Sequence, residues 1–258
     1  MLMNIYKLIS ILLIIQLVSI LKSPIIFSQQ LHKAEALNSS QREEVKNLIK
    51  SFIRNNPELI VESVQKMREK SQNQISNSHK KNIKKYKKLI FYDPQTPIIG
   101  NPNGDITIVE FFDYNCGYCK SSLKVIKKLL EEDTNIRIVL KELPILAPSS
   151  EFAARVALAS WIYNKPLYEK LHSSFMSMSG KLSKQRIMRV VKSFGISEKL
   201  IKKEMFSDPI NKILANNKLL ARELGISGTP GFIIDTKVIP GAVNLSTFKK
   251  LVSEIRSK

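Results

Sequence analysis

The sequence predicts an α/β domain that follows a helical N-terminal segment. Two apolar runs, 106–112 and 136–140, lack the polar alternation of a half-exposed strand and are typical of strands buried on both faces. Between them, the apolar residues of 121–132 recur at the spacing of one helical face. A strand, a helix and a second strand in this order form a βαβ unit. The only two cysteines, Cys116 and Cys119, lie where the first strand passes into the helix.

Composition supports a folded domain and argues against a nucleic-acid partner. The chain has 258 residues, of which 43% are hydrophobic, so it can bury a sizeable core. The formal net charge is +19. The basic residues are mostly scattered lysines, accompanied by abundant Ile, Asn and Ser, and they lack the interleaved arginines and aromatics of base recognition. We therefore expect no nucleic acid among the partners.

Residues 1–28 have the outline of a secretory signal peptide. Lys7 precedes an apolar run over 8–21 that is interrupted by three polar residues and is shorter than the roughly 20 residues of a spanning helix. A cleavage after Ser28 fits the small residue there, although an uncleaved, tethered form stays open. Export matters because a dithiol outside the cytosol can persist as a disulfide.

For residues 29–88, the sequence predicts a helical extension and a basic linker. Apolar spacing indicates two helices over 41–70, with Asn56 as a cap and Pro57 at the first position of the second helix. Their apolar faces either fold back on the main domain or contact other copies, so we expect a homo-oligomer through 41–70 as one of two outcomes. The lysine-rich stretch 70–88 predicts a solvated helix or linker rather than a membrane patch, with a domain boundary near 88.

Residues 89–258 predict one domain with a helical insert at about 147–224. The other expected elements are a strand at 89–92, a turn-rich loop at 100–105, a hairpin around Thr236-Lys237 and a last helix capped by Ser246. Within the insert we assign only packing roles to Trp161, His172 and three methionines, Met176, Met178 and Met188.

The position of the two cysteines predicts redox chemistry. At a helix amino end, the helix dipole and free amide groups favour a thiolate, which makes Cys116 the attacking or leaving sulfur. Cys119, one turn further, can then resolve a mixed disulfide. A purely structural disulfide would close so short a loop that it adds only about 2 kcal/mol. A zinc site lacks ligands at suitable spacing, since His32, His79 and His172 are scattered. A copper(I) site on two thiolates stays as an alternative.

Glu110 is a candidate acid of the same site. It interrupts the apolar run 106–112, where a carboxylate is costly to bury unless it is partnered or protonated. A buried acid beneath the dithiol could accept or relay the proton of Cys119. The alternative is that Glu110 marks the end of the strand and reaches solvent.

Two motifs together resemble the DsbA-like, thioredoxin-fold disulfide oxidoreductases of bacterial envelopes. They are Phe111-Phe112-x-Tyr114-x-Cys116-Gly117-Tyr118-Cys119 and Gly228-Thr229-Pro230-Gly231, with a helical stretch between them. The resemblance covers about residue 89 to the end. It implies a thioredoxin fold with a helical insert and a cis Thr229–Pro230 bond that faces a redox-active Cys116–Cys119 disulfide.

The same resemblance implies roles and partners. Thr229, Pro230 and Tyr118 would bind substrate, with the Thr229 backbone pairing with an extended chain, and Glu110 falls where such proteins carry their buried acid. The implied setting is the periplasm, with reduced or misfolded envelope proteins as substrates, a membrane redox partner, and neither metal nor cofactor.

The direction of electron flow stays open at this point. Gly117-Tyr118, the threonine before Pro230 and the helical extension resemble the isomerase and reductase branch, whereas the insert and overall length resemble the oxidase branch. We expect an oxidase first and an isomerase as the alternative.

Overall fold

The computed structural model describes residues 37–257 and divides the chain into two compact units, Met1–Lys66 and Met67–Lys258. The expected signal peptide, 1–28, lies outside the described residues. Among the residues that are described, no helix is both long and apolar enough to cross a membrane.

The described part of the first unit is helical, as the apolar spacing predicts. Helix α2 spans Ser39–Asn55, and Asn38 and Gln41 form a reciprocal capping box at its start. Helix α3 spans Pro57–Lys85, with proline at its first position and the division between the units after Lys66. The basic stretch that was expected to be a solvated helix or linker is therefore largely the second half of α3.

A five-stranded sheet forms the centre of the second unit. Its strands are β1 (Ile98–Gly100), β2 (Ile106–Phe112), β3 (Ile136–Glu142), β4 (Gly231–Ile234) and β5 (Lys237–Pro240). Their spatial order is β1-β3-β2-β4-β5, with β2 and β3 parallel and every other pair antiparallel. Helix α5 (Gly117–Glu132) connects β2 to β3, which confirms the predicted βαβ unit.

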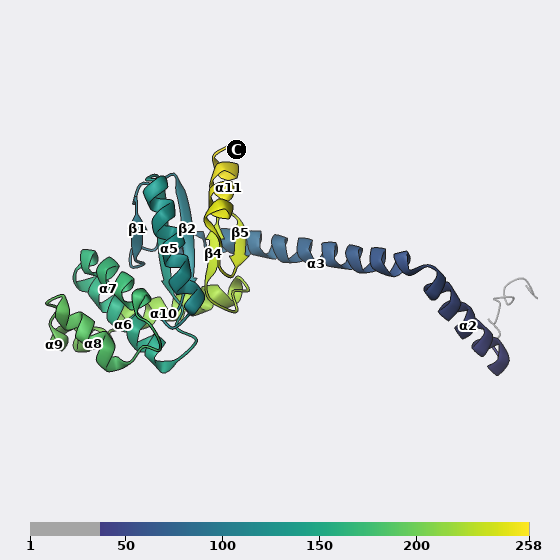
Figure 1. Ribbon diagram of the computed structural model, residues 1–258, viewed down its shortest axis with the longest axis horizontal. Helices are drawn as coiled ribbons and strands as arrows, with labels where there is room; N and C mark the ends of the chain where they lie inside the picture. Colours follow the sequence, from purple (N-terminus) through teal and green to yellow (C-terminus); the bar gives the residue numbers. More distant parts are fainter. Residues whose placement is uncertain (1–36, 258) are drawn as a thin grey trace, which may run out of the picture. The chain divides into compact units, whose positions relative to one another are not determined.

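The two faces of the sheet have separate cores because successive side chains of a strand point to opposite sides. Ile108 and Phe112 of β2 face α5, the helical insert and α11 (Leu245–Arg256), and α5 lies along the sheet in Figure 1. Val109 and Phe111 instead pack with the end of α3 and with α4 (Lys87–Phe91). Strand β2 is thus buried on both faces, as its unbroken apolar run predicts.

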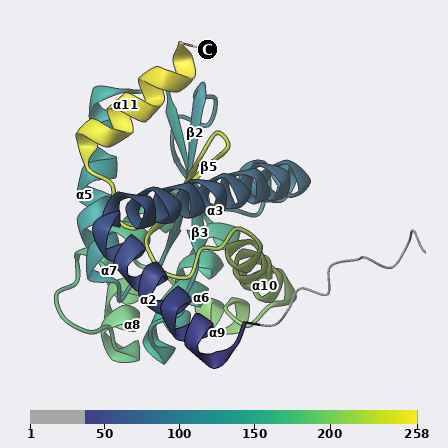
Figure 2. The same ribbon diagram turned by 90° about the vertical axis from the view of Figure 1, so that its right-hand side faces the viewer.

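The insert consists of five helices, α6 (Pro148–Tyr163), α7 (Lys165–Ser177), α8 (Lys184–Ser193), α9 (Glu198–Glu204) and α10 (Asp208–Glu223). Three of them have a proline in the first turn, where its missing amide hydrogen is not needed. Figures 1 and 2 both show α6 to α9 gathered at the end of the sheet away from the carboxyl end of α11. The expected helical insert is therefore present.

Three local expectations were wrong, and one short strand was missed. Residues 89–92 lie in or just after α4 rather than in a strand, and the helix buries Ile90 and Phe91 in one cluster with Ile83 from the end of α3. Strand β1, at 98–100, was not predicted, and it includes residue 100, where the turn-rich loop was expected to begin. The hairpin turns at Asp235-Thr236, one residue earlier than expected. The last helix is capped by Asn244, whose side chain accepts from the Thr247 amide, not by Ser246.

Candidate active site

Cys116 and Cys119 lie at the amino end of α5, where the sequence placed them. Cys116 is the N-cap residue, and its Sγ accepts a hydrogen bond from the Cys119 amide at 3.4 Å. Both cysteines are present as thiols, and both are buried, with 5% and 1% of their surface exposed. The amide group of Cys119, in the first turn of α5, therefore points at the Cys116 sulfur.

Asp113 and Asn115 fix the turn that presents Cys116. The Asp113 carboxylate accepts from the amides of Ile145 and Leu146, each at 2.9 Å, and from the Asn115 amide at 2.7 Å. Its backbone carbonyl accepts from the Cys116 amide. The Asn115 side chain donates to two serine hydroxyls at the start of α6 and accepts from the Leu182 amide. Sequence reasoning missed both residues, although their place inside the motif was a usable signal.

The Thr229–Pro230 segment lies opposite the first cysteine. The Thr229–Pro230 peptide bond is cis, and the Cys116 thiol donates to the Thr229 carbonyl oxygen at 3.1 Å. These residues are 113 positions apart in the chain, so the fold brings the two sequence motifs together. The Thr229 backbone is therefore adjacent to the sulfur at which exchange would begin.

Glu110 is buried on the sheet face that α5 covers. Only 2% of its surface is exposed, so the alternative that it reaches solvent is wrong. Burial raises the pKa of Glu110 to about 8, and its Oε1 has no hydrogen-bond partner among the described residues. Burial also raises the pKa of the Cys119 thiol far above its usual range, with the Glu110 charge acting in the same direction. Glu110 and Cys119 are thus electrostatic neighbours in a region with little water.

Large hydrophobic side chains are exposed on the segments next to Cys116. Tyr118 is 72% exposed, and Ile145 and Leu146 are also exposed although both are large and hydrophobic. A hollow of about 480 Å³ lies between Ile145 and Ser227, two residues before Thr229, and α10 lines it with apolar side chains and with Lys218 and Arg222. The sequence pointed to Tyr118 but missed the two residues after β3, which had no motif to mark them.

A buried polar cluster adjoins the site. Glu142, the last residue of β3, accepts hydrogen bonds from the hydroxyls of Tyr114 and Tyr168 at 3.0 and 2.9 Å. His172 lies 3.2 Å from the Tyr114 hydroxyl through its Nδ1 and stacks on Tyr168, so packing is not its only contribution. Burial lowers the pKa of His172 to about 3, which keeps the ring neutral. The sequence carried no signal for this cluster, because its members come from three segments that are separate in the chain: the turn after β2, the end of β3, and α7.

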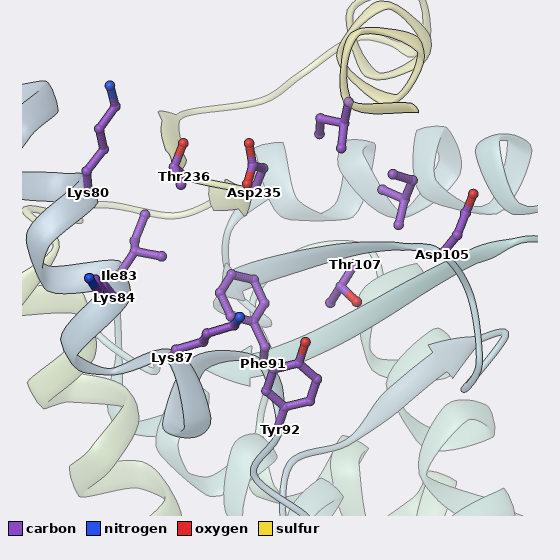
Figure 3. Close-up of a pocket in the computed structure, with 12 residues that line it drawn as sticks. Lys80, Ile83, Lys84, Lys87, Phe91, Tyr92, Asp105, Thr107, Asp235 and Thr236 are labelled. Atoms are coloured by element: carbon purple, nitrogen blue, oxygen red, sulfur yellow. The ribbon is translucent and has the colours of Figure 1, made fainter. Parts of the chain in front are cut away.

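Figure 3 shows the residues that line a further hollow, of about 580 Å³. It lies at the start of β2, beside Asp105 and Thr107, whereas Cys116 follows the end of that strand. Lysines of α3 and α4 line its other side: Lys80, Lys84 and Lys87. Over residues 37–257, no three His, Cys, Asp or Glu side chains gather as metal ligands would.

Solved structures of several known proteins are similar to this chain. A thioredoxin-like oxidoreductase from Silicibacter pomeroyi DSS-3 is 37% identical and has a TM-score of 0.64, over 66% of this chain and 98% of that one. The thiol-disulfide exchange protein alpha-DsbA2 from Wolbachia pipientis is 35% identical and has a TM-score of 0.65, over 70% and 97%. A linker-deletion variant of ScsC from Proteus mirabilis is 28% identical and has a TM-score of 0.66, over 85% and 96%.

Two curated relatives of a different description also match. They are described as Na⁺/H⁺ antiporters of Salinispora arenicola and Salinispora tropica and are 25% and 22% identical. The matches cover 64% of this chain, which spans about a quarter of the length of these relatives.

The family comparison agrees with the fold and with the two motifs. The family described as "DSBA-like thioredoxin domain" matches residues 107–253, which is more than half of the chain and includes Cys116, Cys119 and Pro230. The strand order and the helical insert agree with the thioredoxin fold that the motifs implied. The chain therefore belongs to the DSBA-like thioredoxin domain family.

Proposed function

We propose that the protein is an exported thiol-disulfide oxidoreductase that forms or rearranges disulfide bonds in envelope proteins through Cys116 and Cys119. The observation that carries the proposal is the position of the Cys116 sulfur, at the start of α5 and 3.1 Å from the Thr229 carbonyl oxygen. Membership of the DSBA-like thioredoxin domain family supports the class of reaction.

The two cysteines have different roles in this proposal. As an oxidase, a substrate thiolate attacks Cys116 of the disulfide form, the bond between Cys116 and Cys119 breaks, and Cys119 leaves as a thiolate. The buried Glu110 carboxyl then supplies the proton that makes Cys119 a thiol. A second substrate thiolate attacks the substrate sulfur of the mixed disulfide and releases Cys116. As an isomerase or reductase, the same steps run in reverse, starting from attack by the Cys116 thiolate.

Thr229 and the apolar surface would hold the substrate. An extended substrate chain can hydrogen-bond to the Thr229 backbone, which is β-strand addition on a small scale. Tyr118, Ile145 and Leu146 would then contact its side chains, together with the hollow beside Ser227. The exposed hydrophobic side chains of this surface favour unfolded or misfolded segments whose own hydrophobic residues are exposed.

Purified protein tests the exchange reaction. The wild type should reduce or rearrange scrambled disulfides and oxidise reduced substrates, and Cys116→Ala should abolish turnover. Cys119→Ala should retain the first attack and accumulate mixed disulfides. Retention of full turnover by Cys116→Ala would reject the proposal. Tight copper(I) binding combined with negligible turnover would instead indicate the copper carrier.

The exposed faces of α2 and of the first part of α3 favour isomerase as a second candidate direction. These helices present a row of exposed large apolar side chains: Val45, Leu48, Ile49, Phe52, Ile53, Leu59, Ile60 and Val61. Such a face needs a partner, and we propose that copies of this chain supply it. An assembly with several dithiols would suit rearrangement of wrong disulfides.

Two measurements separate these directions. Alkylation trapping in cells should find Cys116 and Cys119 mostly oxidised if the protein is an oxidase that a membrane partner re-oxidises, and mostly reduced if it is an isomerase. The molar mass from light scattering should exceed that of the monomer and fall to it for Leu48→Asp combined with Phe52→Asp. The matched control is Ser51→Asp, which introduces the same side chain at an exposed polar position of α2.

A further inference from the structure

The hollow of about 580 Å³ in Figure 3 has the size of a small-molecule pocket. Four segments of the second unit line it: the end of α3 with α4, the start of β2, the turn between β4 and β5, and Ile255 of α11. The dithiol follows the other end of β2, and a strand of this length spans roughly 20 Å. The hollow is therefore a separate place in the fold from the exchange site.

Three lysines give the hollow positive charge. Lys80 and Lys84 lie one turn apart on α3, and Lys87 is the first residue of α4. In the part of the chain that the structure describes, none of the three forms an ion pair with a carboxylate. Like charges one turn apart destabilise a helix, so this grouping costs stability while nothing neutralises it. A bound anion would remove that cost.

Two carboxylates also line the hollow, and they do not balance the three lysines. Asp105 is bound by Arg256, whose Nε and Nη2 donate to its two carboxylate oxygens at 2.8 and 2.7 Å. The guanidinium therefore neutralises the charge of Asp105. The second carboxylate is that of Asp235, in the turn between β4 and β5. The remaining charge at the hollow is positive, which favours an anionic ligand.

The rest of the lining is largely apolar and aromatic. Ile83 and Phe91 are buried side chains of α3 and α4, and the Tyr92 ring that follows them is 61% exposed. Figure 3 shows the rings of Phe91 and Tyr92 between the α3 lysines and Thr107. The Thr107 hydroxyl is a possible further hydrogen-bond donor to an anion. A ligand that fits this lining carries an apolar group next to its charge.

We propose that this hollow binds a small organic anion, namely a phosphate or carboxylate that carries an aromatic or short aliphatic group. The three lysines bind the charged group, and the rings of Phe91 and Tyr92 contact the apolar group. Binding is non-covalent, so the ligand is released unchanged. The inference goes beyond the proposed function, because binding here needs neither cysteine of the dithiol.

Calorimetric titration of the full chain with phenyl phosphate tests the proposal. Inorganic phosphate lacks the ring and benzyl alcohol lacks the charge, so each should bind at least about tenfold more weakly than phenyl phosphate. Lys84→Gln combined with Lys87→Gln removes two cations from the hollow and should weaken phenyl phosphate binding about five- to thirtyfold. Tyr92→Ala should weaken phenyl phosphate binding and leave the affinity for inorganic phosphate unchanged, because the ring contacts only the apolar group.

Lys81→Gln combined with Lys88→Gln is the matched control. These two exposed lysines belong to the same two helices but do not line the hollow, so the variant loses the same net charge. Its affinity for phenyl phosphate should equal that of the wild type. If the control weakens binding as much as the hollow pair does, the attraction is that of a basic protein in general and the proposal fails.

Two results with the wild type alone would also overturn the proposal. One is the absence of heat from phenyl phosphate at millimolar concentrations, and the other is equal affinity for phenyl phosphate and inorganic phosphate. A rise in Tm with added phenyl phosphate gives an independent readout, because a ligand that binds the folded state stabilises it. This rise should be smaller for Lys84→Gln combined with Lys87→Gln than for the control pair.

Sedimentation with phosphatidylglycerol vesicles identifies the source of the anion. A dissolved organic phosphate and an anionic lipid both join a phosphate to an apolar group. If Lys84→Gln combined with Lys87→Gln loses phenyl phosphate but sediments with the vesicles like the wild type, the ligand is a dissolved anion. If this variant loses the vesicles and the control pair retains them, the ligand is the lipid. We expect the first result, because the apolar lining lies in a hollow rather than on a helix face that could enter a membrane.

Discussion

Replacement of Glu110 by glutamine should remove a large pH-dependent loss of stability. The folded protein holds the Glu110 proton up to about pH 8, whereas an unfolded glutamate releases it near 4.5. Between these values folding takes up a proton, so the stability contributed by this group is full below pH 4.5 and is lost as the pH rises through 8. Each unit of pKa difference corresponds to about 1.4 kcal/mol, so the loss between pH 5 and pH 8 is roughly 3 to 4 kcal/mol.

Urea denaturation of the reduced protein at pH 5, 6, 7 and 8 measures this effect. The free energy of unfolding of Glu110→Gln relative to the wild type should rise by about 1 kcal/mol per pH unit over this range. The buried amide adds a constant offset of about 1 to 3 kcal/mol, which does not change with pH. The lowered pKa of His172 acts in the opposite sense below pH 6.5, and it cancels in the difference between variant and wild type.

Glu131→Gln is the matched control, because Glu131 is an exposed glutamate on α5. Its unfolding free energy should follow that of the wild type at every pH. If the difference for Glu110→Gln is the same at pH 5 and pH 8, then Glu110 does not hold a proton in the folded state. The role assigned to it in the exchange reaction would then be wrong.

Three further substitutions test the anchoring of the site, the core and the substrate surface. Asp113→Ala leaves three backbone amides without their carboxylate acceptor, so the free energy of unfolding should fall by about 3 kcal/mol or more in urea titrations. Phe248→Ala removes the edge-to-face partner of Phe232 and should cost about 3 to 5 kcal/mol, whereas Phe206→Ala, at an exposed phenylalanine, should cost much less in the same titration. Tyr118→Ala should change the free energy of unfolding by less than about 0.5 kcal/mol and raise KM for protein substrates, because the ring is exposed beside Cys116. An unchanged KM would remove Tyr118 from the substrate surface.

The βαβ unit could be predicted from sequence because each of its elements leaves a long periodic or unbroken apolar signal. Strand β2 has seven residues and α5 has sixteen, and both were found within a few residues of their true ends. Short elements were harder to predict from the sequence. The four apolar residues 89–92 fit a strand or a helical turn equally well, and only packing against Ile83 and Ile233 in the second core decides for a helix.

The candidate site also contains features that the sequence predicted and features that it did not. The helix position of Cys116 and the buried place of Glu110 follow from spacing along one chain segment. The approach of Thr229 to Cys116 depends on a pairing across 113 residues, which the sequence indicated only through resemblance. The Glu142 cluster could not be predicted, because a glutamate at the end of an apolar run is usually solvated, and its two tyrosine donors come from distant segments.

Trapping of mixed disulfides in cells tests the central claim most directly. Cys119→Ala should accumulate covalent complexes with envelope proteins that disappear on reduction, because Cys116 can still attack and nothing in the chain resolves the product. Cys116→Ala should form no such complexes, since the remaining thiol is 1% exposed. Complexes that form through Cys119 in the Cys116→Ala variant, or none in Cys119→Ala, would contradict the account.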